Sequence, residues 1–366
     1  MTVPGLPAQH EIVDPTGPPA PRRPVRVAVA GLGRAGIAHA AAVSSIPGCE
    51  LVGVVDARAA ARRDVRGLGY DAPSFGSVAK LVARTQPDAL FVSAGWQERG
   101  PIARAALEAG VAVCVDPPIA PTLAEAAAVV RLAAERNTPL ASCHALACHP
   151  VFARARAILA SGALGEIRQV RSSTYLSRVF SPESQQRAAP AESAGGALVH
   201  SALDLLFVLL WLLGPPVLVR ATSRRFYGPF EDEIHTMMAL PGGAEVGLDC
   251  SWSVPGYPRQ SSVIEAEGAN GKMLISDDAL EVELASGHGP LPSGPLRLGH
   301  SELPQAARFD LGGETLYLAD ASFLAWVAGG PPPAGRGDAA LEALRVMDVV
   351  YESARDGGKP IAFVAP

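Results

Sequence analysis

Three glycines at fixed spacing mark the first place where this sequence could do chemistry. Residues 25–30 (VRVAVA) form a short apolar run typical of a strand buried on both faces, and GLGRAG at 31–36 follows it directly. Gly31 permits a tight turn, Gly33 lets a ligand approach the backbone, and Gly36 lets the following helix pack closely. The first turn of that helix offers N–H groups and the positive end of its dipole. The loop therefore predicts a site for the phosphates of a dinucleotide.

An acidic residue completes this candidate site. Asp56 follows the apolar run 51–55 and lies 20 positions after Gly36, a spacing typical of dinucleotide-binding units. A carboxylate there accepts hydrogen bonds from the ribose hydroxyls and repels a 2′-phosphate, so we predict NAD and consider NADP the less favoured cofactor. Arg58 and the arginines after it can hold a 2′-phosphate, but we interpret them as an exposed helix face. The residues predicted to contact the cofactor are Gly31, Leu32, Gly33, Arg34, Ala35, Gly36, Asp56, Arg58, Ser93 and Asp116.

A histidine and an aspartate interrupt the most apolar stretch of the chain, residues 197–213. His200 and Asp204 are four positions apart, so one helical face presents an imidazole beside a carboxylate. A carboxylate within about 4–6 Å raises the pKa of a histidine and fixes its tautomer, which suits a general acid or base near neutral pH. We predict that this pair is catalytic. The alternative is a buried polar pair that satisfies its own hydrogen bonds.

Two cysteines and two histidines gather at 143–149 (CHALACH), a combination that raises the question of a zinc site. Cys143 and Cys148 are five positions apart, and adjacent residues rarely bind one tetrahedral ion, so we predict no metal. We expect His144 to line the cofactor and substrate cleft and Cys148 to be a small core residue. Tyr175 and His235 are weaker candidates for substrate binding, and both could be ordinary sheet residues.

Hydrophobic patterning divides the chain into three parts. Residues 1–24 are rich in proline and are predicted to be a disordered arm. Over 25–146, short apolar runs alternate with helical segments, which predicts an α/β fold with a doubly wound parallel (Rossmann) sheet. Later segments such as 244–252 alternate between apolar and polar residues. We therefore expect 147–366 to be an α+β domain with a predominantly antiparallel, open-faced sheet.

Composition excludes several classes of protein. The chain has 366 residues, of which 48% are hydrophobic and 18% charged, so it can bury a large core. Its formal charge of −5 gives no electrostatic case for a nucleic acid or an anionic membrane as partner, and the apolar stretch at 197–213 is short for a membrane span. Five cysteines, an odd number, do not suggest a disulfide framework, and we see no secretion signal. We predict a cytoplasmic location.

Eight segments carry a family likeness. They are VAVAGLGRAGIAH (27–39), PDALFVSA (87–94), AALEAGVAVCVDPPIAPTLAEA (105–126), SGALGEIRQVR (161–171), GGALVHSALDLLFVLLWLLG (195–214), GAEVGLDCSW (243–252), IEAEGANGKMLI (264–275) and DAALEALRVMDVVYESARDGGKPI (338–361). Together they resemble the Gfo/Idh/MocA family of NAD(P)-dependent oxidoreductases. The resemblance implies hydride transfer between nicotinamide and a carbon bearing oxygen in a small polyol, sugar, cyclitol or related metabolite. It also implies a second domain that binds substrate and forms a homodimer or homotetramer through its sheet.

The catalytic positions depart from the family pattern. The family typically carries Glu-Lys-Pro after the strand predicted at 111–115, and here Asp116 and Pro117 stand in its first two places. Proline cannot transfer a proton, and we expect Asp116 to shape the nicotinamide pocket on its substrate side. The family's Asp-x-x-x-His is reversed, with His200 and Asp204 exchanged. Two alternatives therefore stay open: a redox-neutral enzyme (epimerase, dehydratase or cyclase) and a non-catalytic cofactor-binding protein on the same scaffold.

Overall fold

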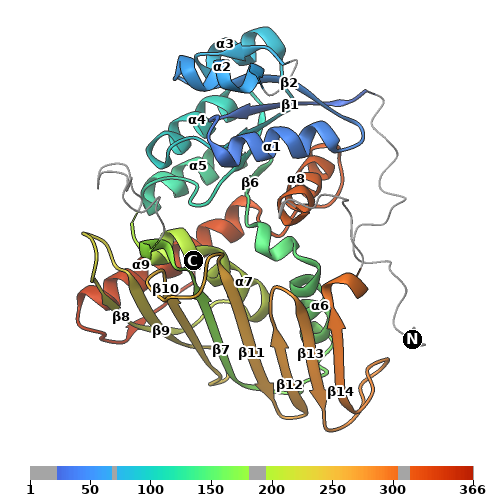
Figure 1. The fold of residues 1–366 in the computed structure, drawn as a ribbon, viewed down its shortest axis with the longest axis vertical. Coiled ribbons are helices and arrows are strands. Elements are labelled where there is room, and N and C mark those ends of the chain that lie inside the picture. Colours follow the sequence, from blue (N-terminus) through green and yellow to red (C-terminus); the bar gives the residue numbers. More distant parts are fainter. Residues whose placement is uncertain (1–22, 68–71, 181–194, 304–313, 366) are drawn as a thin grey trace. The chain divides into compact units, whose positions relative to one another are not determined.

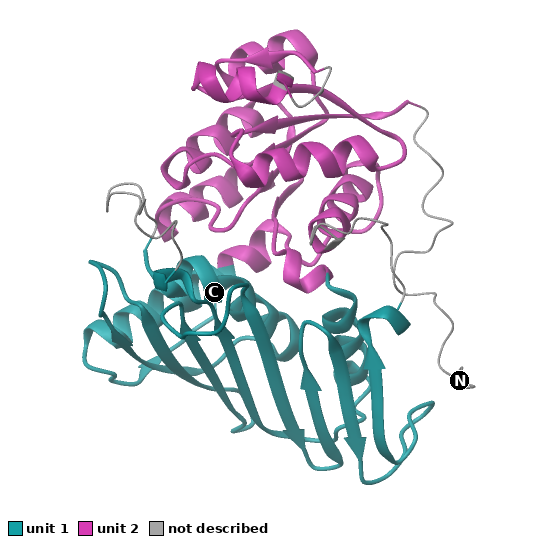
Figure 2. Cartoon of the chain, viewed as in Figure 1, with its two compact units in different colours: residues 1–14, 149–305, 342–366 teal, residues 15–148, 306–341 magenta. Residues whose placement is uncertain are grey.

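The computed structural model describes residues 23–67, 72–180, 195–303 and 314–365. Two compact units make up the chain, and each has a sheet of its own (Figures 1 and 2). The parallel-sheet unit takes its described residues from 15–148 and 306–341, and the antiparallel-sheet unit takes them from 149–305 and 342–366.

The predicted division of the chain differs from these units in one respect. The break between 25–146 and 147–366 lies close to the observed one, but the residues described in 306–341 return to the parallel-sheet unit. A helix there packs against elements formed much earlier in the sequence, a contact that local patterning does not reveal. The arm predicted at 1–24 lies outside the described residues, apart from its last two positions.

The parallel sheet confirms the predicted Rossmann-type fold. Its six strands run in the order β3-β2-β1-β4-β5-β6, and every pair is parallel. The strands are β1 (Val25–Ala30), β2 (Cys49–Val55), β3 (Ser74–Phe75), β4 (Ala89–Val92), β5 (Ala112–Val115) and β6 (Leu140–Ser142). The central strands β4 and β5 are buried along their whole length, which is why they read as unbroken apolar runs.

Helices follow these strands in sequence. They are α1 (Arg34–Ser45), α2 (Ala59–Gly67), α3 (Val78–Thr85), α4 (Trp96–Glu108), α5 (Leu123–Glu135), the 3₁₀ turn η1 (Ala145–Cys148) and α8 (Glu314–Val327). The hydroxyl of Thr122 caps α5 by accepting the amide of Glu125. Helix α8 contacts α1 and η1. Because of this contact, a segment from late in the sequence completes the unit that holds the glycine loop.

The antiparallel sheet also agrees with the prediction. Its nine strands run in the order β14-β13-β12-β11-β7-β10-β9-β8-β15, and the one parallel pair joins β7 to β10. The strands are β7 (Ile167–Tyr175), β8 (Leu218–Arg224), β9 (Glu233–Ala239), β10 (Glu245–Ser251), β11 (Ser261–Gly268), β12 (Gly271–Ile275), β13 (Ala279–Leu284), β14 (Gly294–Gly299) and β15 (Ile361–Ala362). Along β10, Val246, Leu248 and Cys250 are buried, and the residues between them lie on the open face.

Helices α6 (Pro150–Ala160), α7 (Leu203–Leu213) and α9 (Gly337–Arg355) lie along one face of this sheet (Figure 1). Helix α6 contacts β12 and β13, and the π-helical turn η5 (Leu198–Ala202) contacts β7 and β10. The unit also contains the short turns η2 (Arg178–Phe180) and η6 (His300–Glu302), and α9 belongs to it from residue 342 onward. The apolar stretch 197–213 is therefore a buried helix, opened by η5. Among the described residues, no helix is both long and apolar enough to cross a membrane.

Candidate active site

The glycine loop lies where β1 ends and α1 begins. The amide of Gly31 donates to the Val55 carbonyl (2.8 Å), and the φ of +86° at Gly31 favours glycine. A Cβ at Gly31 would collide with the backbone at Ala94, and a Cβ at Gly36 would overlap the carbonyl oxygen of Gly31. A Cβ at Gly33 would meet nothing within 4 Å. The protein itself therefore demands two of the glycines, and the third leaves open space in which a pyrophosphate fits.

Asp56 joins this loop to the end of β2. The carboxylate is nearly buried and accepts the amide of Leu32 (2.8 Å), so it is aligned on the glycine loop. Burial alone would raise the pKa of Asp56, but hydrogen bonds from Arg58 and from the Leu32 amide outweigh it and hold the pKa below its ordinary value. The Asp56 side chain is thus an anion at neutral pH, as recognition of a ribose diol requires.

Arg58 is tied to the same carboxylate. Its guanidinium donates to both oxygens of Asp56 (3.1 and 2.9 Å), although 67% of the arginine side chain is exposed. Arg62 donates to the Asp56 carbonyl instead. The two arginines therefore hold Asp56 in place, while Arg58 is largely exposed, as expected, and lies just before α2.

The ends of β4 and β5 bring two more predicted residues to this edge of the sheet. Ser93 follows β4 and Asp116 follows β5, and both strands are parallel neighbours in the centre of the sheet. Arg99, which lies on α4, bridges the two loops: it donates to the Ala94 carbonyl (3.1 Å) and to the Pro117 carbonyl (2.5 Å). Sequence reasoning missed Arg99. Helix α4 begins at Trp96 and carries Pro101 in its interior.

A buried histidine contacts Asp116 from behind. His39 is 1% exposed; its Nε2 lies 3.0 Å from Asp116 Oδ1, and its Nδ1 lies 2.9 Å from both carboxylate oxygens of Asp320. Burial would lower the pKa of His39, but the two carboxylates outweigh it and place that pKa well above its ordinary value. Burial raises the pKa of Asp320 to about 6. Sequence reasoning assigned no role to His39 or Asp320. The one available signal was the histidine three positions after the third glycine.

The cysteine and histidine cluster at 143–149 divides between different surroundings. Cys143 lies with His39 and Asp116 in the only described group of three potential metal-binding side chains, whose ligand atoms are within 4.8 Å of one another. Both nitrogens of His39 already face carboxylates, and we assign no ion to the group. His144 is buried after β6, and Cys148 packs against the hydrophobic core, as expected of it. His149 belongs to the other unit, where it caps α6.

His200 and Asp204 lie on consecutive turns of the antiparallel-sheet unit. His200 is exposed in the π-helical turn η5, and Asp204 is half-buried in the first turn of α7. The pair does not share the uniform α-helix that the spacing predicted, because a π-helical turn intervenes; such turns occur often at functional sites. The His200 ring stacks on Trp252, with centroids 6.2 Å apart, and the Arg178 guanidinium lies 5.0 Å from the Trp252 ring centre.

Two adjacent buried acids build this environment. Glu231 accepts the amide of Leu198 (3.2 Å) with its carboxylate, and its carbonyl accepts the amide of Ala197 (3.0 Å), so it fixes the start of η5. Asp232 accepts the indole N–H of Trp252 at 2.7 Å. Its second carboxylate oxygen accepts the backbone amides of Phe226 and Tyr227. Sequence reasoning missed both acids, because their burial, which calls for hydrogen-bond partners, is seen only in the structure.

Tyr175 and His235 do not lie with His200. Both occupy the open face of the sheet, whereas η5 packs on the other face through the hydrogen bond from Cys250 to the Ala197 carbonyl. His235 pairs with Asp249 across β9 and β10 (2.7 Å), and Tyr175 packs against Tyr257. Burial and the nearby Asp249 raise the pKa of Tyr175. Tyr175 and His235 therefore lie on the opposite face of the sheet from the turn that carries His200, because adjacent positions of a strand point in opposite directions.

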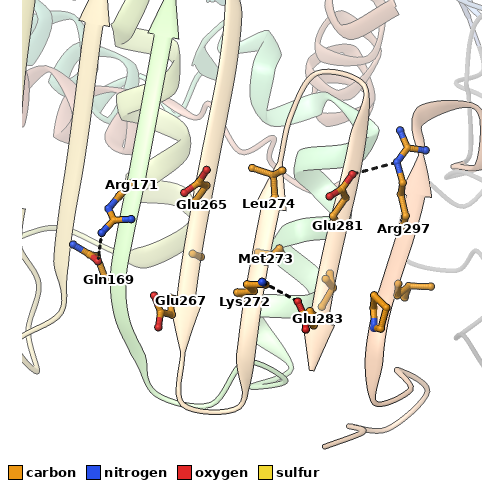
Figure 3. Close-up of a pocket in the computed structure, with 14 residues that line it drawn as sticks. Gln169, Arg171, Glu265, Glu267, Lys272, Met273, Leu274, Glu281, Glu283 and Arg297 are labelled. Carbon is orange, nitrogen blue, oxygen red and sulfur yellow. Dashed lines mark hydrogen bonds and ion pairs between the residues drawn. The ribbon is translucent and has the colours of Figure 1, made fainter. Parts of the chain in front are cut away.

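The open face also carries a hollow of about 620 Å³ over β7 and β11–β14 (Figure 3). Charged side chains line it, and ion pairs join neighbouring strands: Lys272 to Glu283 (2.9 Å) and Glu281 to Arg297 (3.3 Å). Arg171 donates to Gln169 on its own strand. These groups are paired with one another along the sheet and show no arrangement suited to proton transfer.

Comparison with known proteins assigns both units. A family model described as "Oxidoreductase family, NAD-binding Rossmann fold" matches residues 25–144, and another described as "GFO/IDH/MocA C-terminal domain" matches 152–273. The chain belongs to the Gfo/Idh/MocA family. The resemblance inferred from the sequence is thus confirmed, and the protein is an NAD-binding oxidoreductase of the Gfo/Idh/MocA type.

Individual Gfo/Idh/MocA relatives are distant. The chain is 27% identical over 348 residues to "Myo-inositol dehydrogenase Hyg17" of Streptomyces leeuwenhoekii, which covers 92% of this chain and 99% of the relative. It is 25% identical over 234 residues to "Trans-1,2-dihydrobenzene-1,2-diol dehydrogenase" of Sus scrofa, covering 62% and 68%. A solved structure of levoglucosan dehydrogenase with NADH and levoglucosan shares the fold with a TM-score of 0.84, 20% identity, and coverage of 93% and 100%.

Proposed function

We propose that this protein is an NAD-dependent dehydrogenase or reductase of small polyols, sugars or cyclitols. The observation that carries the proposal is the hydrogen bond from the Leu32 amide to Asp56, which aligns an ionised carboxylate with a glycine loop that has open space at Gly33. A bound nicotinamide would supply or accept the hydride, exchanged with a carbon that bears oxygen. The relatives named for myo-inositol and for a dihydrodiol support this substrate class, because both names describe vicinal hydroxyls on a ring.

The proton that accompanies hydride transfer needs a group of its own, and we assign it to His200. Its imidazole is exposed at the start of the buried helix, where it can reach a substrate oxygen, and Trp252 supports one face of the ring. Asp204, one turn further on, serves as its carboxylate partner. Pro117 stands where the family resemblance places a lysine, so in this proposal His200 serves as the general acid or base.

The decisive experiment follows absorbance of the reduced nicotinamide while the purified protein meets a panel of inositols, aldoses and dihydrodiols with NAD⁺ or NADP⁺. We expect turnover with a ring polyol and a preference for NAD⁺. Product formation without net change in cofactor would overturn the proposal in favour of a redox-neutral epimerase, dehydratase or cyclase. Cofactor binding with no product from any panel member would favour the non-catalytic alternative. Fluorescence titration with NADH and NADPH tests the cofactor preference separately, and tighter binding of NADPH would contradict the proposed preference for NAD.

We also propose that the protein works in the cytoplasm as a homodimer or homotetramer. The five cysteines are unpaired, which suits a reducing compartment. The open face of the antiparallel sheet offers a broad surface with charged, cross-strand ion pairs, on which a second subunit can pack. Sedimentation of the purified protein tests the oligomer, and a monomer at micromolar concentration would contradict it.

A further inference from the structure

We propose that His39 and Asp320 are positioning residues: together they hold the Asp116 carboxylate ionised and in one orientation at the edge of the sheet where the dinucleotide binds. The expected effect on cofactor binding rests on the proposed function, whereas the hydrogen-bonded array itself rests on the geometry of the parallel-sheet unit. Asp116 follows β5, His39 lies on α1 and Asp320 lies on α8, so three separate segments build the array.

The distances define a continuous line of hydrogen bonds. Asp116 Oδ1 lies 3.0 Å from His39 Nε2, and both oxygens of Asp320 lie 2.9 Å from His39 Nδ1. The Phe91 ring stacks on the imidazole with centroids 5.0 Å apart, and Phe323 packs against Phe91. The side chains of His39 and Asp320 are 1% and 0% exposed, while 16% of the Asp116 side chain is exposed. Asp116 is therefore the one member of the line that reaches the surface.

Proton counting fixes the charge of the line. A neutral imidazole has one N–H and can donate to one carboxylate, but an imidazolium donates to both. His39 faces a carboxylate at each nitrogen, so the imidazolium form is the one that both hydrogen bonds require. One imidazolium between two carboxylates leaves a net charge of −1, and Asp116 presents it.

The other groups around His39 support this assignment. The thiols of Cys143, Cys114 and Cys148 lie near the array, and burial contributes to raising the pKa of each, so all three are neutral. The Arg99 guanidinium is a further charged group, and it lowers the pKa of Asp116. Besides the two carboxylates, Cys143 also raises the pKa of His39.

A fixed anion at this edge has a chemical consequence. The oxidised nicotinamide ring carries a positive charge and the reduced ring does not, so a nearby carboxylate favours the oxidised form of the bound cofactor. No ammonium follows Asp116, because the next residue is Pro117. The charge of Asp116 is thus left to act on the cofactor, provided that His39 keeps the carboxylate oriented.

The test replaces Asp320 with Asn and measures NAD⁺ and NADH binding by calorimetry at about pH 6 and about pH 8.5. In Asp320→Asn, Asp116 is the one carboxylate left beside His39. At low pH the imidazolium then cancels the charge of Asp116, whereas at high pH the neutral ring keeps its N–H on Nε2, donates it to Asp116 and leaves the carboxylate charge in place. We expect NAD⁺ affinity to fall about tenfold at low pH and to recover within about twofold at high pH, with NADH affinity changing less. A loss that is the same at both pH values would overturn the proposal, because a purely packing role has no pH dependence.

Two controls complete the experiment. The first control is Asp88→Asn, which removes another carboxylate of the same unit. Asp88 lies just before β4, accepts the Arg26 amide and pairs with Arg23. Its replacement should leave NAD⁺ affinity independent of pH. In Asp116→Asn, the further change Asp320→Asn should have no additional effect on NAD⁺ affinity, because the two residues act through one carboxylate. Additive losses would contradict the inference.

A spectroscopic measurement tests the array without substrate or cofactor. Nitrogen-15 NMR of the wild-type protein labelled at histidine, with the His39 signals assigned by their loss in His39→Gln, should show both ring nitrogens protonated from about pH 6 to about pH 8. A neutral tautomer at pH 7 would overturn the proposal. This readout decides the inference even if Asp320→Asn fails to fold, and it separates failure of the array from failure of the proposed enzymatic function.

Discussion

The two units of this protein surround a histidine in opposite ways. In the parallel-sheet unit, His39 is 1% exposed and lies between two aspartates, in contact with an aromatic ring. In the antiparallel-sheet unit, His200 is exposed on a π-helical turn, and its ring stacks on Trp252. Burial between carboxylates fixes a charge and removes the ring from the reach of a substrate. Exposure leaves a ring able to accept and donate a proton, which is what acid–base catalysis needs.

The supports of the two sites differ as well. The glycine loop is shaped by backbone contacts within a short stretch of sequence, where a Cβ at Gly31 or Gly36 would collide with main-chain atoms. The His200 site is shaped by side chains, since Glu231 anchors its turn and Asp232 anchors the tryptophan beside it. The backbone-built site should tolerate almost no change at Gly31 or Gly36, whereas single substitutions in the site built from side chains should reduce its function gradually.

The largest effect should come from filling the glycine loop. Gly36→Val places a branched side chain against the Gly31 carbonyl oxygen, so the loop must open and the phosphate site is lost. We expect NADH binding, measured by fluorescence titration, to weaken by at least about a hundredfold. Gly110→Ala is the matched control: it has a φ of +76° and open space around its Cβ, so it should cost about 1 kcal/mol of stability but leave NADH affinity unchanged. Normal NADH binding by Gly36→Val would contradict the backbone-built site.

The second effect separates catalysis from cofactor binding. His200→Ala should lower kcat by about a hundredfold while NADH affinity stays within about twofold, because the imidazole is assigned to the proton and not to the dinucleotide. Steady-state kinetics on the substrate found in the panel checks this. His288→Ala, another exposed histidine of the same unit, should leave kcat unchanged. Retention of wild-type kcat by His200→Ala would remove its assigned role.

A third histidine sharpens the comparison through stability. His149 accepts the Val151 amide at the start of α6 and stacks on His300. Burial first, and then the neighbouring His300, lower the pKa of His149 from 6.5 to about 4. The folded protein therefore favours the neutral ring, so stability that is present above pH 6.5 is lost as the pH falls toward 4.

The corresponding measurement is thermal or urea unfolding between about pH 7 and about pH 5. We expect the free energy of unfolding to fall by about 2 kcal/mol from this group over that range. His149→Asn keeps an N-cap but cannot titrate, so its stability should depend less on pH. An equal pH dependence in both proteins would show that His149 is not responsible.

The smallest effect concerns the choice of cofactor. Asp56→Ala removes the carboxylate that accepts the Leu32 amide and releases Arg58 from its ion pair. NADH should bind about tenfold more weakly, and NADPH should bind as well as before or better, because an arginine is freed for the 2′-phosphate. Asp64→Ala, on the exposed side of α2, is the control and should change neither affinity. An unchanged ratio of the two affinities would exclude Asp56 from cofactor discrimination.

Local features of the sequence predicted much of the fold. The apolar runs at 25–30, 51–55 and 111–115 identified β1, β2 and β5, whereas the two-residue strand β3 was not predicted, and the alternation at 244–252 identified β10 and its two faces. Alternation also contained a signal that was not used. The hairpin between β9 and β10 sets His235 opposite Asp249, which places His235 on the open face and away from His200. Tyr175 lies on the same open face, so a role of these two residues in substrate binding stays a prediction that is separate from His200.

What the sequence determined by itself was the dinucleotide loop and the residue at the end of β2. Their geometry depends on backbone angles within a few consecutive positions and on the regular order of parallel strands. Asp320 is 281 positions from His39 in the sequence, and only the tertiary structure decided that it would complete a buried line of hydrogen bonds with His39 and Asp116. Likewise, only the folded chain brings Asp232 to Trp252. Such partners meet because of the path of the chain through packed helices and sheets, and no local pattern encodes that path.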